Sequence, residues 1–142
     1  MKKFLDVLTT VLLSMSFMLF DANAAQYFDG IWQLNNADGY FGGVLEIKNC
    51  TAIRCDFKIQ SWYDQHICDT DGQIVLTSTT IGIYTDKKYM YDAKNDKEYS
   101  VPVGINFESL SDGGLSLKYT TPDSHGAFCG MSATLEGVWY KS

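Results

Sequence analysis

Beyond its first 24 residues the chain has no long run of apolar residues. A membrane-spanning helix needs about 20 such residues, so we expect no membrane span in residues 25–142. Apolar residues spaced three and four apart are also lacking, which argues against amphipathic helices. Only two prolines are present, and Pro102 and Pro122 can both sit at strand starts or turns. These absences direct attention to a β-rich fold.

Basic residues are few, with 11 Lys and Arg against 17 Asp and Glu and a net charge of −6. Without a basic cluster, the chain is poorly suited to nucleic acid or to an anionic membrane surface. Its electrostatic field favours a cationic partner, although the need for solubility explains such a charge equally well.

Catalytic motifs are absent as well. No serine lies in a G-x-S-x-G context, and no glycine-rich phosphate loop precedes a helix. The chain has two histidines, His66 and His125, and each follows an aspartate by two residues. Such a set could bind a metal or act as acid and base. We favour polar surface loops, and we expect no catalytic residues, no metal site and no cofactor.

The first 24 residues have the features of a secretory signal peptide. Lys2 and Lys3 precede an apolar run of about 13 residues, Leu8 to Phe20, and Ala22-Asn23-Ala24 fits a cleavage site. The alternative, a membrane anchor, needs a longer run. We therefore expect cleavage after Ala24, a periplasmic or secreted location, and one domain over residues 25–142.

All four cysteines lie in that domain, as expected for two disulfides in an exported protein. Cys50 and Cys55 flank a short turn and can bridge the mouth of a hairpin, which leaves Cys68 and Cys129 for a second bond. Zinc is the competing use, but one C-x4-C pair and two distant single cysteines match zinc spacing poorly.

Apolar residues alternate with polar ones almost throughout the domain, which indicates strands separated by Gly, Asp and Asn turns. The turns are predicted at Asn35–Gly39, Asp69–Gly72 and Ser111–Gly114, and the charged segment Asp86–Glu98 is predicted as a hairpin tip or mobile loop. The segment Asp69–Gly72 also matches the start of a calcium loop, but it lacks the later acidic ligands. We predict an all-β, antiparallel up-and-down barrel of about eight strands.

Two similar phrases stand near the ends of the domain: FDGIWQ, Phe28 to Gln33, and LEGVWY, Leu135 to Tyr140. The first and last strands of an up-and-down sheet must pair if the sheet is to close. We interpret the phrases as those two strands, with Trp32 and Trp139 packed inside one end of the barrel. The residues predicted to fill the interior are Trp32, Phe57, Phe107, Met131 and Trp139.

Several landmarks resemble known exported proteins. Gly30-Ile31-Trp32 is similar to the opening of lipocalin-like barrels. The Cys50/Cys55 pair, His66-Ile67-Cys68, Phe128-Cys129-Gly130 and the aromatic last strand resemble small exported bacterial β-barrel proteins. Some periplasmic barrels of this size are lysozyme inhibitors. The resemblance implies a lipocalin-like fold and a binding role, and it carries over no inhibitory loop residue by residue.

Exposed aromatic side chains on turns are common anchors for recognition. The candidate binding residues are Tyr40, Phe41, Trp62, Tyr63, His66, Tyr89, Tyr91 and His125. We expect a monomer that binds another protein and inhibits a cationic cell-wall hydrolase such as lysozyme. The alternative is a lipocalin-like carrier of a small apolar ligand inside the barrel.

Overall fold

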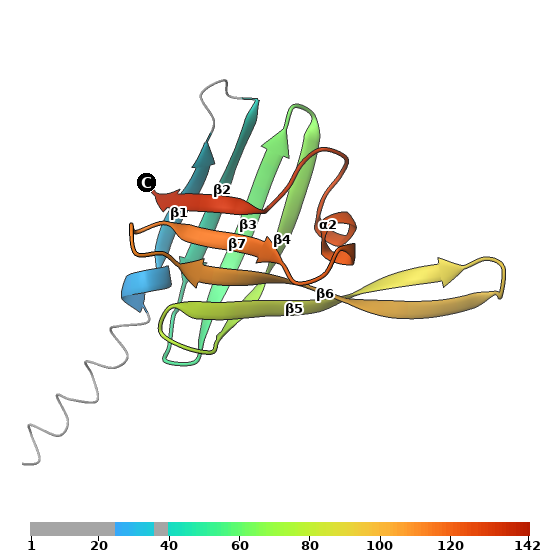
Figure 1. Ribbon diagram of the computed structural model, residues 1–142, viewed down its shortest axis with the longest axis horizontal. Helices are drawn as coiled ribbons and strands as arrows, with labels where there is room; N and C mark the ends of the chain where they lie inside the picture. The colour runs from blue at the N-terminus through green and yellow to red at the C-terminus, as the bar shows by residue number, and fades with distance from the viewer. Residues whose placement is uncertain (1–24, 36–39) are drawn as a thin grey trace, which may run out of the picture.

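The chain folds into a closed antiparallel barrel in the computed structural model, which describes residues 25–35 and 40–142 (Figure 1). The elements are β1 (Gly30–Asn35), β2 (Phe41–Lys48), β3 (Arg54–Tyr63), β4 (His66–Leu76), β5 (Ile81–Asp92), β6 (Lys97–Ser109), β7 (Leu115–Tyr119), α2 (Asp123–Phe128) and β8 (Gly137–Lys141). Each strand pairs with the next along the chain, and β1 pairs with β8. The predicted up-and-down barrel of about eight strands is confirmed. The predicted leader and part of the predicted turn at Asn35–Gly39 lie outside the described residues.

The two similar phrases form the closing seam of the barrel. Trp32 pairs with Lys141 and Gln33 pairs with Tyr140, so β1 and β8 lie side by side. Trp139 stands two residues before Lys141 and is therefore a diagonal neighbour of Trp32 on the same face. Both tryptophans are buried. The predicted closure is confirmed.

Each phrase also builds the same local structure. The indole N–H of Trp32 donates to the carbonyl of Phe28 at 2.9 Å, and that of Trp139 donates to the carbonyl of Leu135 at 3.1 Å. Gly30 and Gly137 open their strands with φ values of +135° and +142°, which side chains strongly disfavour. The glycine bends the chain so that the tryptophan folds back onto the residue four positions earlier.

Side chains fill the barrel. Every strand alternates between buried and exposed positions along its barrel portion, and the inward residues form one core cluster. The Trp139 ring crosses the interior to β2, where a β-carbon at Gly43 would overlap it. Trp32, Phe57, Phe107 and Trp139 lie inside as predicted. Met131 was wrongly predicted to face inward. It is 76 % exposed, because the chain from Cys129 to Glu136 is a loop and not a strand.

The barrel wall opens between β4 and β5, which form only two pairs, Val75 with Ile83 and Leu76 with Gly82. Helix α2 covers this opening. Its Phe128 ring lies 6.0 Å from the ring of Tyr84, and its buried Ser124 hydroxyl accepts the Gly104 amide of β6 at 2.9 Å. The sequence pattern predicted no helix here, since six residues are too few to display a helical period.

The predicted turn at Asp69–Gly72 is wrong, because these residues continue β4. Asp69 pairs with Gln60 and Asp71 pairs with Lys58 of β3. On its other side this part of β4 has no strand neighbour among the described residues. Aspartate and glycine are usual on such open edges, where charge discourages pairing with other chains. The predicted turn at Ser111–Gly114 is present, closed by the Leu110 amide donating to the Gly114 carbonyl at 2.8 Å.

Both predicted disulfides are present. Cys50–Cys55 spans the connection from β2 to β3, and Cys68–Cys129 ties the segment after α2 to β4. The second bond joins residues 61 positions apart and stabilises the fold by about 4 kcal/mol in the loop-entropy model. Disulfides of this kind fit a periplasmic or extracellular compartment. No helix in the described part of the chain is long and apolar enough to span a membrane.

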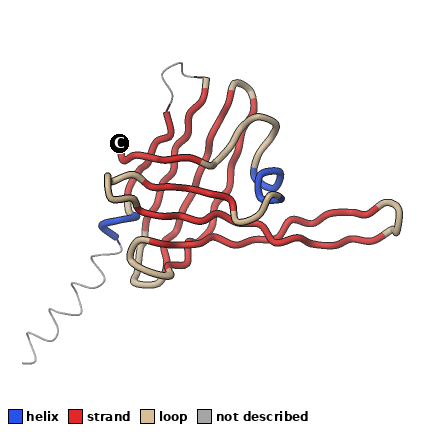
Figure 2. Tube along the Cα trace, in the orientation of Figure 1, coloured by secondary structure: helices blue, strands red, loops and turns tan. Residues whose placement is uncertain are grey.

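A long hairpin projects from the barrel (Figures 1 and 2). It consists of the outer parts of β5 and β6, which pair from Thr85 with Gly104 to Asp92 with Lys97. The predicted hairpin tip in Asp86–Glu98 is thus confirmed, but strand structure continues through Asp92 and resumes at Lys97. We call residues 85–104 the arm.

The close contact at Gly43 gives a stability prediction. We expect Gly43→Ala to lower the free energy of unfolding by about 1–3 kcal/mol, because the new methyl group collides with the Trp139 ring in a filled core. Urea denaturation measures the change.

The matched control is Gly126→Ala in α2, where the new methyl meets only the flexible end of Lys88. Alanine favours a helix over glycine by about 0.5–1 kcal/mol, so this variant should be neutral or more stable. Equal effects at the two positions would contradict the packing described for Gly43.

Candidate functional site

Five of the predicted binding residues meet at one end of the barrel. Phe41 on β2 pairs with Tyr63 on β3, and Tyr63 pairs with His66 on β4. Tyr40 precedes Phe41, and Trp62 precedes Tyr63. Residues from three strands therefore converge where β2 begins and where the β3–β4 hairpin turns.

The β3–β4 turn fixes this end. Asp64 and Gln65 form a two-residue connection, and Asp64 adopts a φ of 53°, a conformation that aspartate tolerates. The Asp64 amide donates to the Tyr40 carbonyl at 2.8 Å, so the residue before β2 is tied to the hairpin tip. The turn is thus braced from both sides.

The aromatic rim, as we call Tyr40, Phe41, Trp62, Tyr63 and Ile67, is an apolar surface. Tyr40 is 65 % exposed and Tyr63 is 46 % exposed, while Phe41 and Trp62 are half-buried. The rings of Phe41 and Tyr63 lie 6.5 Å apart at an angle of 56°. The Trp62 ring packs over Gly42, its partner across the strands. Adjacent exposed aromatic groups mark an interaction surface better than single ones do.

The segment after α2 extends the rim. The Gly130 amide donates to the Ile67 carbonyl at 3.1 Å, and the Cys68–Cys129 disulfide holds the preceding residue. The exposed Met131 follows directly. The sequence reasoning missed Ile67 and Met131 as surface residues. The predicted disulfide was the available signal, because it placed Met131 near His66 and Ile67.

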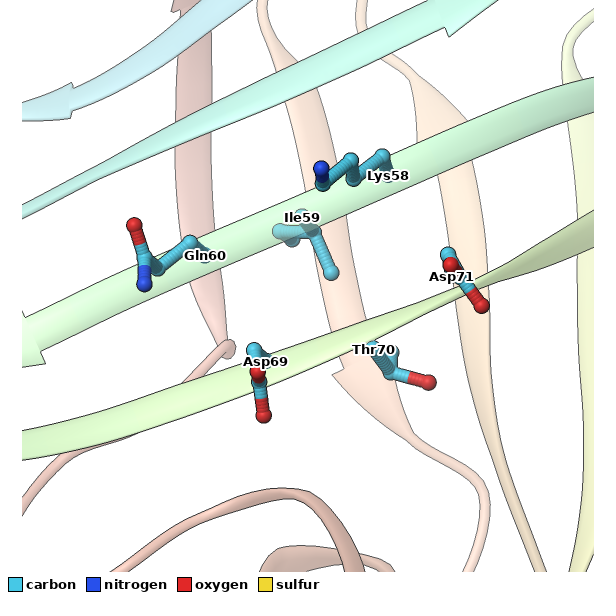
Figure 3. Close-up of a pocket in the computed structure, with 6 residues that line it drawn as sticks. All are labelled: Lys58, Ile59, Gln60, Asp69, Thr70 and Asp71. Atoms are coloured by element: carbon cyan, nitrogen blue, oxygen red, sulfur yellow. The ribbon is translucent and has the colours of Figure 1, made fainter.

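A polar hollow of about 430 Å³ borders the rim on the outer face of β3 and β4 (Figure 3). Its sides are two pairs across the strands, Lys58 with Asp71 and Gln60 with Asp69. The ion pair found in the described chain is Lys48–Glu46 at 3.4 Å, so neither aspartate of the hollow is neutralised by a salt bridge. The hollow can receive a cationic or hydrogen-bonding group.

His125 does not join the rim. Its Nε2 lies 2.8 Å from the Ala133 carbonyl, and its ring stacks edge-on against Tyr119 at 5.9 Å. Beside it, the Tyr119 hydroxyl accepts the Leu135 amide at 2.8 Å, and burial raises the pKa of that hydroxyl. These contacts hold the loop before β8. The described residues contain no group of three His, Cys, Asp or Glu that could hold a metal ion.

Tyr89 and Tyr91 lie on the arm, away from the rim. They are 78 % and 60 % exposed and project from the same face of the hairpin. The Tyr91 hydroxyl donates to the Asp96 carboxylate, and this bond raises the pKa of Tyr91. At the base of the arm, burial raises the pKa of Tyr84, whose hydroxyl donates to Asp86 at 3.0 Å.

Comparison of this chain with protein-family models, with curated proteins and with solved structures finds no match. The resemblance to lipocalin-like barrels and to lysozyme inhibitors therefore stays a prediction.

The contacts of Tyr119 predict a structural role with a pH signature. We expect Tyr119→Phe to lower the free energy of unfolding by about 1–3 kcal/mol at neutral pH, because the amide of the buried Leu135 loses its acceptor. The raised pKa means that the neutral phenol stabilises the fold below its unfolded pKa of 10.0, and that this support is lost as pH rises through the folded pKa. The difference from wild type should narrow at alkaline pH.

Urea denaturation across pH provides the measurement, with Tyr140→Phe as the control, since the exposed Tyr140 hydroxyl makes only a 3.4 Å bond to Asp112. A Tyr119→Phe protein as stable as the control would contradict this role.

Proposed function

We propose that this protein is an exported binding protein that attaches to another protein through the aromatic rim and inhibits a cationic cell-wall hydrolase such as lysozyme. The observation that carries the proposal is the convergence of exposed aromatic side chains from three strands at one end of a filled barrel. Catalysis has no part in the proposal.

The rim has the properties of a binding surface. Tyrosine and tryptophan contribute large contact areas and a polar atom each, and they are enriched among residues that dominate binding energy. The two-residue turn and the bond from Asp64 to Tyr40 hold the rim in shape. A preorganised surface loses little conformational entropy on binding, which raises affinity.

Charge supports a cationic partner. The chain carries a net charge of −6, and carboxylates lie beside the rim at Asp64, Asp69 and Asp71. Opposite charge speeds the approach of a basic protein and disfavours acidic ones. In this mechanism the β3–β4 turn enters the substrate cleft, and the adjacent carboxylates meet the basic margin of that cleft.

The alternative function, transport of a small apolar ligand in the barrel, draws no support from the interior. Inward positions are occupied by large side chains such as Trp32, Phe107 and Trp139. A ligand would have to displace packed aromatic rings, which costs several kcal/mol of core packing.

A lysis assay tests the proposal. Residues 25–142 with both disulfides are added to lysozyme, and the loss of turbidity of bacterial cells is followed. We expect inhibition that weakens with added salt, since exposed charges are screened. Tyr63→Ala should raise the inhibition constant about 30-fold, the effect of losing a residue worth about 2 kcal/mol.

The control is Tyr140→Ala, which removes a similarly exposed tyrosine from the barrel wall at β8 and should inhibit as wild type does. Absence of inhibition at excess protein would remove lysozyme as the target. Equal inhibition by the two variants would show that the rim is not the contact.

A further inference from the structure

The arm is a two-stranded ribbon without other strand neighbours. Along β5, pairing with β4 ends at Ile83, and along β6, pairing with β7 begins at Ile105. Beyond these points β5 and β6 pair only with each other, as Figure 2 shows. An isolated two-stranded hairpin is marginally stable in water, and each of its edges offers unpaired backbone groups. The arm therefore gains from a partner strand.

Charge on the arm differs from charge on the rest of the protein. The chain as a whole carries −6, but the arm is balanced. It has four basic and four acidic residues: Lys87, Lys88, Lys94, Lys97, Asp86, Asp92, Asp96 and Glu98. Two arms can thus approach each other without net repulsion.

The open edge of β5 has a defined pattern. The Ser109 amide donates to the Thr80 carbonyl, which places even-numbered residues of β5 in hydrogen-bonded pairs with β6. Odd-numbered residues then direct their backbone groups to the other side. Ile83 does so toward Val75 of β4. Lys87, Tyr89 and Tyr91 do so toward open space.

We propose that the arm binds the arm of a second copy of this chain, with the two β5 strands antiparallel and the twofold axis at Met90. In this register Tyr89 faces Tyr91 of the other copy in hydrogen-bonded pairs. Lys88 then faces Asp92, and Asp86 faces Lys94. The interface is the same on both copies, as a twofold axis requires.

The sequence of β5 selects this register. Opposite charges and aromatic pairs directly across two strands stabilise a sheet, and like charges destabilise it. An axis at Tyr89 would place Asp86 against Asp92, and an axis at Tyr91 would place Lys88 against Lys94. The axis at Met90 allows the open-edge residues to bond to each other and opposes no like charges.

The barrel leaves space for the second arm. Beyond Ile83, β4 runs in a different direction from the arm (Figure 1). The tip of the second arm would reach the region of Asp86, close to the Tyr84 hydroxyl, at the opening between β4 and β5. Its Lys94 would supply a cation there. The aromatic rim at the other end of the hairpin β3–β4 stays uncovered, so this proposal is independent of the proposed function.

Sedimentation velocity of residues 25–142 over a range of concentrations tests the proposal. The paired edges are short, so we expect a weak dimer whose fraction rises with concentration. Lys88→Asp places aspartate against Asp92 twice in the dimer, and Asp92→Lys places lysine against Lys88 twice. Each variant alone should be monomeric.

An equal mixture of the two variants should dimerise again, because every facing pair then has opposite charges. This rescue separates the interface from local damage, which matters because the Lys88 ammonium also lies beside Gly126 of α2. The matched control is Lys87→Asp, which makes the same charge change but faces Ala93, and it should dimerise like wild type. A wild-type protein that stays monomeric at all concentrations, or a mixture without rescue, would overturn the proposal.

Discussion

The pairing of β1 with β8 is the constraint on which the rest of the barrel depends. It rests on two residue pairs, and both strands would otherwise be open edges at the ends of a sheet. The two tryptophans strengthen this short seam from inside. Each donates its indole N–H to a carbonyl four residues earlier, so a buried polar group is satisfied and the ring is held in one orientation. Closure by two short strands is thereby compatible with a well-packed core.

The opposite side of the wall shows what incomplete closure requires. Where β4 leaves β5, helix α2 and the Cys68–Cys129 disulfide cover the opening. The same bond brings Met131 next to Ile67, so a device that completes the core also extends the rim. The part of β4 that remains uncovered carries Asp69 and Asp71. Charge on that edge protects it from adventitious pairing and contributes to the acidic surface beside the rim.

The rim and the arm are two surfaces with different chemistry. The rim is apolar, braced and bordered by carboxylates, which suits a basic partner. The arm is charge-balanced and self-complementary, which suits another copy of itself. Dimerisation through the arms would place two rims on one particle, and a partner displaying several copies of the target would then be held more tightly through effective concentration.

Strand faces, turn Ser111–Gly114, both disulfides and the closing seam were determined by the sequence itself, because each follows from local periodicity, spacing or the repeated phrase. Tertiary structure decided the rest. Asp69–Gly72 has turn chemistry, yet pairing with β3 keeps it in a strand. Met131 fits an inward period, yet the disulfide at Cys129 holds its loop outside. The aromatic candidates were identifiable, but their division between rim and arm was not. Strand register brings Tyr63 to Phe41 and His66, and the same kind of pairing carries Tyr89 away on the arm, and such long-range pairing leaves no trace in a local pattern.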